Sequence, residues 1–307
     1  MGLADKLIVD FRDYNKARHE IIQYPAGELQ VRIHPGWIET FEAAKEIVIH
    51  AQLTDEEGGL NASIIGLLML NDAIVAVNPA AKRILYLPYL PYARADRRFV
   101  PGDCHGLATF GEILRVAHFD ETRTLDVHHA SRSFMWIPRL RNIQPDELIN
   151  RALDEFAFGK YGVTVLFPDE GAAKRYGNMR REGVQFLCAT KKRDATTGEL
   201  LGFDVPDTTQ FKFDRIMIVD DICDGGGTFV GVAEALRAKG NSMQLGLYVT
   251  HGIFSNGFSK LREYFDEIYT TDSVWREGSR QRGFTVYDAY AALDSNDVSP
   301  EKSTRAV

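Results

Sequence analysis

The sequence predicts an α/β protein in which mainly parallel β-sheets are flanked by helices and divided between two domains. Short apolar runs rich in β-branched residues alternate with segments of helical period, which is typical of parallel sheets. Several runs are apolar almost throughout, as strands covered on both faces should be. At 307 residues the chain is too long for one average domain. The predicted strands are residues 46–53, 83–90, 123–129, 163–168, 184–190, 216–221, 245–250 and 267–271.

Apolar stripes at helical spacing predict helices between these strands. The stripes are Leu107, Phe110 and Leu114; Ile149, Ala152, Leu153 and Phe156; and Phe229, Val232, Ala233 and Leu236. The last of these helices is expected to end at Lys239 and Gly240, because glycine commonly follows the final helical turn.

A polar, irregular segment around residues 139–146 is the best candidate for a domain boundary. We therefore expect an N-terminal domain over residues 1–143 and a C-terminal domain over residues 144–293. Residues 294–307 have little to bury, so we expect a disordered tail there.

Composition narrows the classes of function. The chain carries 36 Lys and Arg residues against 43 Asp and Glu residues, a formal net charge of −7, so we expect no nucleic-acid or membrane partner. The cysteines, Cys104, Cys188 and Cys223, are too widely spaced to suggest a zinc site or a disulfide framework. No apolar leader is visible, and residues 62–77 look too short to span a bilayer. We expect a cytoplasmic protein.

The most informative motif is residues 220–228, which read Asp-Asp-Ile-Cys-Asp-Gly-Gly-Gly-Thr between an apolar strand and a helix. Glycines allow backbone N–H groups to approach a phosphate closely, and the start of a helix favours the same anion. Paired aspartates suit sugar hydroxyls, or a divalent cation that accompanies a diphosphate. A plain helix cap with a glycine turn would explain one aspartate and one glycine, not three of each.

This motif resembles the phosphoribosyl diphosphate loop of the type I phosphoribosyltransferase fold. The resemblance implies either a transferase that consumes phosphoribosyl diphosphate or a ribose-phosphate diphosphokinase that makes it. The other motifs distinguish the two classes, because the transferases have one such domain and lack nucleotide-binding elements.

Residues 91–98 (Pro-Tyr-Ala-Arg-Ala-Asp-Arg-Arg) resemble the nucleotide-binding motif of the diphosphokinases. Arginine side chains suit polyphosphates because each can bind two oxygens at fixed geometry. Residues 24–28 (Tyr-Pro-Ala-Gly-Glu) resemble a family segment that reaches the adenine pocket of a neighbouring subunit. The resemblance thus implies nucleotide binding by Tyr24, Glu28, Arg94, Asp96 and Arg97.

Further segments extend the resemblance over roughly residues 20–275, in family order and across both domains. Residues 124–129 and 167–171 resemble family segments near the metal, and residues 249–255 resemble one near the C-terminus. Residues 190–193 resemble the root of the mobile catalytic loop, and polar residues 194–207 suit a flap that closes over substrate. The sequence is therefore identified as a divergent member of the ribose-phosphate diphosphokinase family, with two tandem phosphoribosyltransferase-like domains.

The resemblance implies Mg²⁺-dependent transfer of the β,γ-diphosphate of ATP to the 1-hydroxyl of ribose 5-phosphate, with AMP as the second product. It assigns Lys191 and Arg193 to catalysis, and a dimeric or hexameric homo-oligomer to the protein. The implied metal-associated residues are His128, Asp169, Asp220 and Asp221. The implied ribose-phosphate-binding residues are Asp220, Asp221, Asp224, Gly225, Gly226, Gly227 and Thr228.

Departures from the family pattern leave alternatives open. Ala26 and Ala95 stand where the family has aspartate and glutamine, which puts strict recognition of adenine in doubt. The glycines at 225 and 226 replace larger residues, so we expect a roomier phosphate pocket. One alternative acceptor is therefore a larger ribose 5-phosphoester such as ADP-ribose, which would connect the protein to NAD metabolism. A second alternative is an inactive regulatory paralogue.

Overall fold

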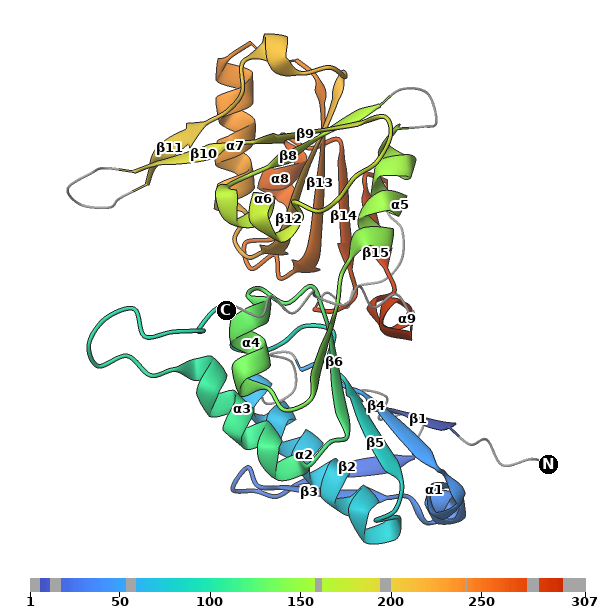
Figure 1. The fold of residues 1–307 in the computed structure, drawn as a ribbon. Coiled ribbons are helices and arrows are strands. Elements are labelled where there is room, and N and C mark those ends of the chain that lie inside the picture. Colours follow the sequence, from blue (N-terminus) through green and yellow to red (C-terminus); the bar gives the residue numbers. More distant parts are fainter. Residues whose placement is uncertain are drawn as a thin grey trace, which may run out of the picture. The chain divides into compact units, whose positions relative to one another are not determined.

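A computed structural model describes residues 6–11, 18–53, 59–157, 162–193, 200–240, 242–274 and 282–294 (Figure 1). The chain divides into two compact units. Met1–Gln144 and the segment that begins at Ala289 form the N-terminal unit, and Pro145–Asp288 form the C-terminal unit.

In the N-terminal unit, a five-stranded parallel sheet has the order β1-β4-β5-β6-β7 among the described residues. These strands are β1 (Lys6–Asp10), β4 (Glu46–His50), β5 (Lys82–Tyr86), β6 (Glu121–Leu125) and β7 (Leu140–Ile143). The order follows the chain without reversal. Because parallel crossovers are almost always right-handed, a sheet wound in one direction receives all of its crossover helices on one face.

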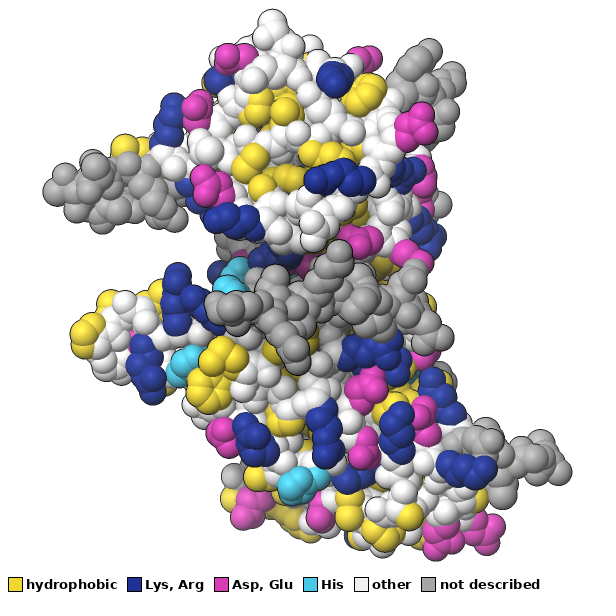
Figure 2. Space-filling view, in the orientation of Figure 1, with side chains coloured by type: hydrophobic (Ala, Val, Ile, Leu, Met, Phe, Trp, Pro, Cys, Tyr) yellow, Lys and Arg dark blue, Asp and Glu magenta, His cyan; other side chains and the backbone are white. Residues whose placement is uncertain are grey.

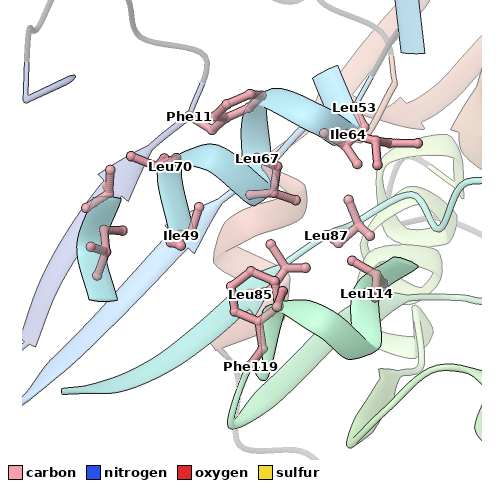
Figure 3. Packing of buried hydrophobic residues seen from close by; sticks show 14 of the residues in the cluster. Phe11, Ile49, Leu53, Ile64, Leu67, Leu70, Leu85, Leu87, Leu114 and Phe119 are labelled. Carbon is pink, nitrogen blue, oxygen red and sulfur yellow. The ribbon is translucent and has the colours of Figure 1, made fainter. Parts of the chain in front are cut away.

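The remaining elements of this unit are α1 (Ile38–Ala43), α2 (Gly59–Val77), α3 (Gly106–Ala117), α4 (Ala130–Trp136), the 3₁₀ helix Pro35–Trp37, and the hairpin of β2 (His19–Gln23) and β3 (Leu29–Ile33). Side chains of α2 and of the sheet point toward one another in the core (Figure 3). Leu67 and Leu70 of α2 and Ile49 and Leu85 of the strands are fully buried there.

Helix α2 corrects the expectation that this apolar segment is too short to span a bilayer. It begins at Gly59, runs for 19 residues and reaches a mean hydropathy of 1.8, which is enough by length and composition to cross a membrane. Core helices of soluble proteins reach the same length and hydropathy. In the structure, Ile64, Leu67 and Ile74 of α2 are buried in the N-terminal core.

In the C-terminal unit, a six-stranded parallel sheet has the order β15-β14-β13-β12-β8-β9 among the described residues. These strands are β8 (Val163–Phe167), β9 (Val184–Cys188), β12 (Arg215–Cys223), β13 (Gln244–Gly252), β14 (Glu267–Thr271) and β15 (Phe284–Tyr287). Here the strand order reverses between β8 and β12. Such a reversal opens a crevice at the carboxyl ends of the two strands.

Because the direction of winding changes, helices cover both faces of this sheet. The other elements are α5 (Asp146–Ala157), α6 (Glu170–Arg175), α7 (Gly227–Ala238), α8 (Ser259–Arg262), the 3₁₀ helix Thr208–Gln210, and the hairpin of β10 (Thr190–Arg193) and β11 (Leu200–Asp204). Ile216 and Ile218 of β12 pack with α7, whereas Met217 and Val219 pack with α5 and α6. The predicted fold class, including apolar strands covered on both faces, is confirmed.

The last helix, α9 (Ala289–Asp294), belongs to the N-terminal unit, whereas the sequence placed residues up to 293 in the C-terminal domain. Tyr86 faces away from its buried neighbour Leu85, because side chains alternate along a strand. The Tyr86 hydroxyl donates to Asp294 Oδ1 at 2.8 Å, and Arg123 Nη1 donates to the Leu293 carbonyl at 3.1 Å. Helix α9 therefore meets the sheet face opposite α2 and α3. The expected tail beyond Asp294 lies outside the described residues.

The expected strands and the three striped helices are present, with ends that differ by a few residues. The strands that the sequence did not predict include β7 and β15, which lie at sheet edges, and the hairpin β10–β11. Strand β7 reads Leu-Arg-Asn-Ile, and its polar content led to its assignment as irregular sequence.

Because α9 packs in the N-terminal unit, we predict that its residue Leu293 stabilises that unit. Leu293 is fully buried, so Leu293→Ala should cost about 2–5 kcal/mol of unfolding free energy by leaving a cavity. Hydrogen exchange should show the loss of protection in β4, β5 and β6 of the N-terminal unit. The matched variant Leu236→Ala, in α7, should instead lower protection in the C-terminal unit. Lost protection confined to the C-terminal unit in Leu293→Ala would contradict the assignment of α9.

Candidate functional site

The reversal of strand order gathers three predicted carboxylates at one edge of the C-terminal sheet. Asp169 follows β8 and caps α6, where its Oδ1 accepts from the Ala172 N–H at 3.0 Å. Asp220 and Asp221 lie near the carboxyl end of the adjacent strand, β12. The switch point of the sheet, where a ligand crevice is expected, thus carries acidic side chains.

Arg175, at the end of α6, neutralises the aspartate pair. Its Nη1 lies 3.2 Å from Asp220 Oδ1 and 2.6 Å from Asp221 Oδ1. The exposed fractions of the three side chains are 15%, 16% and 4% respectively, so the triad is largely removed from water. Without the guanidinium, two carboxylates would be left buried and uncompensated.

Burial raises the pKa of Asp220 well above its ordinary value, and the nearby charge of Asp221 raises it further. Arg175 and the N–H of Asp221 act in the opposite direction. The pKa of Asp220 is raised because two carboxylates with like charge lie together in one desolvated site. The pair is therefore poised to accept hydrogen bonds or a cation, since either would stabilise the ionised form.

The predicted phosphate loop connects β12 to α7. Gly226 caps α7 with φ +82°, a backbone conformation that L side chains rarely adopt. Gly227 and Thr228 form the first turn of this helix of 12 residues, where backbone N–H groups lack partners within the helix. These free donors and the helix dipole provide the anion site that the motif predicts.

We expected the glycines of the loop to leave a roomier phosphate pocket, but only some of them have open space beside them. A Cβ on Gly225 would lie 2.7 Å from Asn256 Nδ2, and one on Gly226 would lie 3.2 Å from a Leu261 methyl group. A Cβ on Gly227 would meet no described atom within 4 Å. The space beside Gly227 is therefore open, whereas the Asn256 side chain occupies the space beside Gly225.

Lys191, the first predicted catalytic residue, is held by Asp169. Its Nζ lies 2.6 Å from Asp169 Oδ2, and both side chains are about a quarter exposed, at 27%. Burial opposes ionisation of Asp169, but the hydrogen bond from Lys191 and those from backbone N–H groups outweigh it and lower the pKa of this carboxyl. Arg193 lies on the same strand, β10, but its side chain lies outside the described part of the structure.

The expected flap over residues 194–207 lies partly within the described residues. Residues 194–199 lie outside the described residues. Leu200–Asp204 form β11, paired antiparallel with β10, and the Phe203 ring packs so closely on α7 that a Cβ at Gly231 would lie 2.5 Å from it. The second half of the segment is thus a strand anchored to α7.

In the N-terminal unit, the predicted nucleotide-binding loop follows β5 and the predicted His128 segment follows the neighbouring strand β6. Arg132 of α4 links the two, because its Nη1 donates to Asp96 Oδ2 at 2.7 Å. Asp96 is buried, whereas Arg94 and Arg97 are exposed at the surface. Asp96 is therefore a structural anchor for the loop, and the arginines remain accessible to an anion.

Tyr24 and Glu28 lie at the tip of the β2–β3 hairpin, where Gly27 turns with φ +89°. Tyr24 is 47% exposed. Contact with a neighbouring subunit, as the resemblance implies, stays a prediction.

The residues implied for the metal are divided between the two units. His128 belongs to the N-terminal unit, and Asp169, Asp220 and Asp221 belong to the C-terminal unit. Among the described residues, no group of three or more His, Cys, Asp or Glu side chains could hold a metal ion. Asp169 and the aspartate pair each have a protein cation as partner, so the donor set fits a cation that arrives with a diphosphate better than a resident one.

Sequence reasoning missed Arg132 and did not assign Arg175 to the site. Both lie in helices that directly follow strand-end motifs. This position in the sequence could have identified them as site residues. On the face shown in Figure 2, Lys and Arg side chains are interspersed with Asp and Glu side chains, so basic residues at the surface gave little guidance.

Replacing Arg175 tests its role in neutralising the pair. Arg175→Met should cost about 3–5 kcal/mol of unfolding free energy at neutral pH, because it leaves two buried carboxylates without a cation. The raised pKa of Asp220 means that the folded state binds its proton more tightly than the unfolded state. Stability is therefore lost as pH rises through that pKa, and the deficit of the variant should shrink as pH falls.

Urea unfolding over a pH series measures this deficit. Arg175→Lys, which keeps a cation, is the matched control and should recover part of the stability. A deficit that does not change with pH would mean that Arg175 stabilises the fold by packing alone.

No family model matches the chain. The ribose-phosphate pyrophosphokinase of Pyrococcus furiosus is 28% identical over 258 residues, which cover 83% of this chain and 85% of that protein. The ribose-phosphate pyrophosphokinase of Bradyrhizobium diazoefficiens is 31% identical over 225 residues, 70% of this chain and 68% of that protein. In fold, the chain is similar to phosphoribosylpyrophosphate synthetase from Mycobacterium smegmatis, with a TM-score of 0.74, 19% identity, and coverage of 94% of this chain and 97% of that one. These similarities establish that the chain belongs to the ribose-phosphate pyrophosphokinase family of diphosphotransferase enzymes.

Proposed function

We propose that this protein transfers the β,γ-diphosphate of ATP to the 1-hydroxyl of ribose 5-phosphate, producing phosphoribosyl diphosphate and AMP in a Mg²⁺-dependent reaction. The observation that carries the proposal is the group of side chains at the strand reversal of the C-terminal unit. There a desolvated aspartate pair, a glycine loop at a helix start and the Lys191–Asp169 ion pair follow neighbouring strands. Family membership supports the same reaction.

In this proposal the C-terminal unit binds the acceptor. The aspartate pair accepts hydrogen bonds from the ribose hydroxyls, while Arg175 limits repulsion between the two carboxylates. Asp224 and Gly225–Thr228 surround the 5-phosphate with backbone N–H groups. Positioning of this kind contributes most of the catalysis in phosphoryl transfers, because it holds the attacking hydroxyl in line.

Lys191 stabilises charge on the transferred group. In the structure its ammonium is paired with Asp169, so its charge is held at the crevice before substrate binds. When a diphosphate with more negative charge arrives, the flexible lysine side chain can share or exchange its partner. Such a positive charge acts where negative charge develops, and it is worth most in a site from which water is excluded.

The N-terminal unit binds ATP through Arg94 and Arg97, and Mg²⁺ enters as a partner of the ATP phosphates. His128 and Asp169 are the residues that would assist it. Mg²⁺ usually keeps several waters and binds through one or two protein groups together with phosphates, which agrees with the lack of a complete cage among the described residues.

We further place the protein in the cytoplasm as a homo-oligomer. The three cysteines are free, which agrees with a reducing compartment. The exposed Tyr24 at the hairpin tip supports contact with a neighbouring subunit.

Acceptor identity is tested by offering ribose 5-phosphate and ADP-ribose separately, each with ATP and Mg²⁺. We expect AMP and phosphoribosyl diphosphate from ribose 5-phosphate, detected by mass spectrometry, because the Asn256 side chain occupies the space beside Gly225. Product from ADP-ribose alone would favour the larger ester. No product from either acceptor would favour the inactive paralogue.

Lys191→Ala should lower kcat by about 10²–10³-fold, because a single charge that stabilises the transition state is lost. Lys192→Ala is the matched control: the next residue points to the other side of the strand, pairs with Asp204 at 3.6 Å, and should leave kcat unchanged. Steady-state kinetics with ribose 5-phosphate measures both. Undiminished turnover in Lys191→Ala would refute its catalytic assignment.

A further inference from the structure

The segment that follows β13 packs against the phosphate loop. Ser255 Oγ donates to Asp224 Oδ1 at 2.7 Å, and Asn256 Nδ2 donates to the Gly225 carbonyl at 3.3 Å. Two successive residues thus hold the first two positions of the loop. Both are exposed, as are Gly225 and Gly227, so this side of the loop is open to solvent and to ligand.

Asn256 occupies the space beside Gly225. Its Nδ2 lies 2.7 Å, and its Cγ 3.5 Å, from the place that a Cβ on Gly225 would take. The side chain that lines the loop at this point therefore comes from Asn256 and not from the loop itself. The space at Gly227 is open by contrast.

The Asn256 amide retains hydrogen-bonding capacity. One Nδ2 hydrogen is used by the Gly225 carbonyl, and within the described part of the chain Asn256 makes no other side-chain hydrogen bond. An amide NH₂ has two donors and the amide oxygen is an acceptor. One donor next to a set of free helix N–H groups is therefore available to a phosphate oxygen.

We propose that Asn256 is a specificity-determining residue for the acceptor, an inference that rests on the proposed function. Asn256 donates a hydrogen bond to the 5-phosphate and closes the loop beside Gly225 against a bulky substituent. A phosphomonoester is accommodated, whereas the remainder of a larger ester must leave past Gly227. Ser255 is a positioning residue that orients Asp224.

Three variants test the proposal by calorimetric titration with inorganic phosphate and with ribose 5-phosphate, and by steady-state kinetics with ribose 5-phosphate and ADP-ribose. Asn256→Ala should weaken binding of both phosphate ligands about tenfold, because a hydrogen bond to a charged group is lost. It should raise KM with kcat unchanged, since the contact is remote from the reacting hydroxyl. The preference for ribose 5-phosphate over ADP-ribose should also decline.

Asn256→Asp separates contact with the phosphate from a merely structural role. It keeps the shape of the side chain but adds a negative charge, so binding should weaken about a hundredfold, beyond the effect of alanine. Ser259→Ala, an exposed neutral change in the neighbouring helix α8, is the matched control and should leave affinity unchanged. Thermal unfolding of each variant verifies that it is folded.

The outcomes distinguish this inference from the proposed function. Wild-type turnover combined with unchanged phosphate affinity in both Asn256 variants would overturn the role of Asn256 alone. Equal weakening by alanine and aspartate would also overturn contact with the phosphate, because a negative charge in contact with a bound anion must repel it. Asn256-dependent phosphate binding without formation of phosphoribosyl diphosphate would refute the proposed reaction and support the phosphate contact.

Discussion

The right-handedness of parallel crossovers governs where each helix of this chain can lie. In the N-terminal unit the strands are added in one direction, so α2, α3 and α4 accumulate on one face of the sheet. The opposite face is then met by α9, which comes from the far end of the chain. In the C-terminal unit the order reverses between β8 and β12, so helices cover both faces, and the reversal is where such sheets bind ligands. The same rule thus explains the return of the last helix and the place of the candidate site.

Charge neutralisation within the protein is the second organising feature. Arg175 compensates the buried pair of Asp220 and Asp221, and Lys191 compensates Asp169. Each carboxylate site is therefore held in place by a cation before any ligand binds. Removing one partner of such a group leaves an uncompensated charge, which costs far more than the net contribution of the pair. The arrangement ties the stability of the crevice to the residues proposed to bind the acceptor.

The N-terminal unit shows a related use of polar groups beneath α9. Burial, followed by the hydrogen bond to Asp294, raises the pKa of Tyr86, so its hydroxyl stays protonated and donates to that carboxylate. Arg123 donates both to the Tyr86 hydroxyl and to the Leu293 carbonyl. His50 stacks on Tyr290 with ring centroids 4.4 Å apart. Helix α9 has only six residues, and an isolated helix of that length is not stable in water. These contacts with the sheet therefore stabilise it.

The amino-acid sequence alone predicts the fold class, the buried strands, the three striped helices and the motif over residues 220–228, because each depends on a local period or a local string of residue types. The pairs of residues that meet across the fold are seen only in the folded structure. Arg175 reaches Asp220 across 45 residues, Asn256 reaches Gly225 across 31, and Tyr86 reaches Asp294 across 208. The edge strand β7 is hard to predict because half of its sequence, Leu-Arg-Asn-Ile, is polar, and strands at an edge need less apolar sequence than central ones. A local pattern shows the period of one helix or strand. Contacts between residues far apart in the chain depend on sheet order and helix placement, and a local pattern gives no information on either.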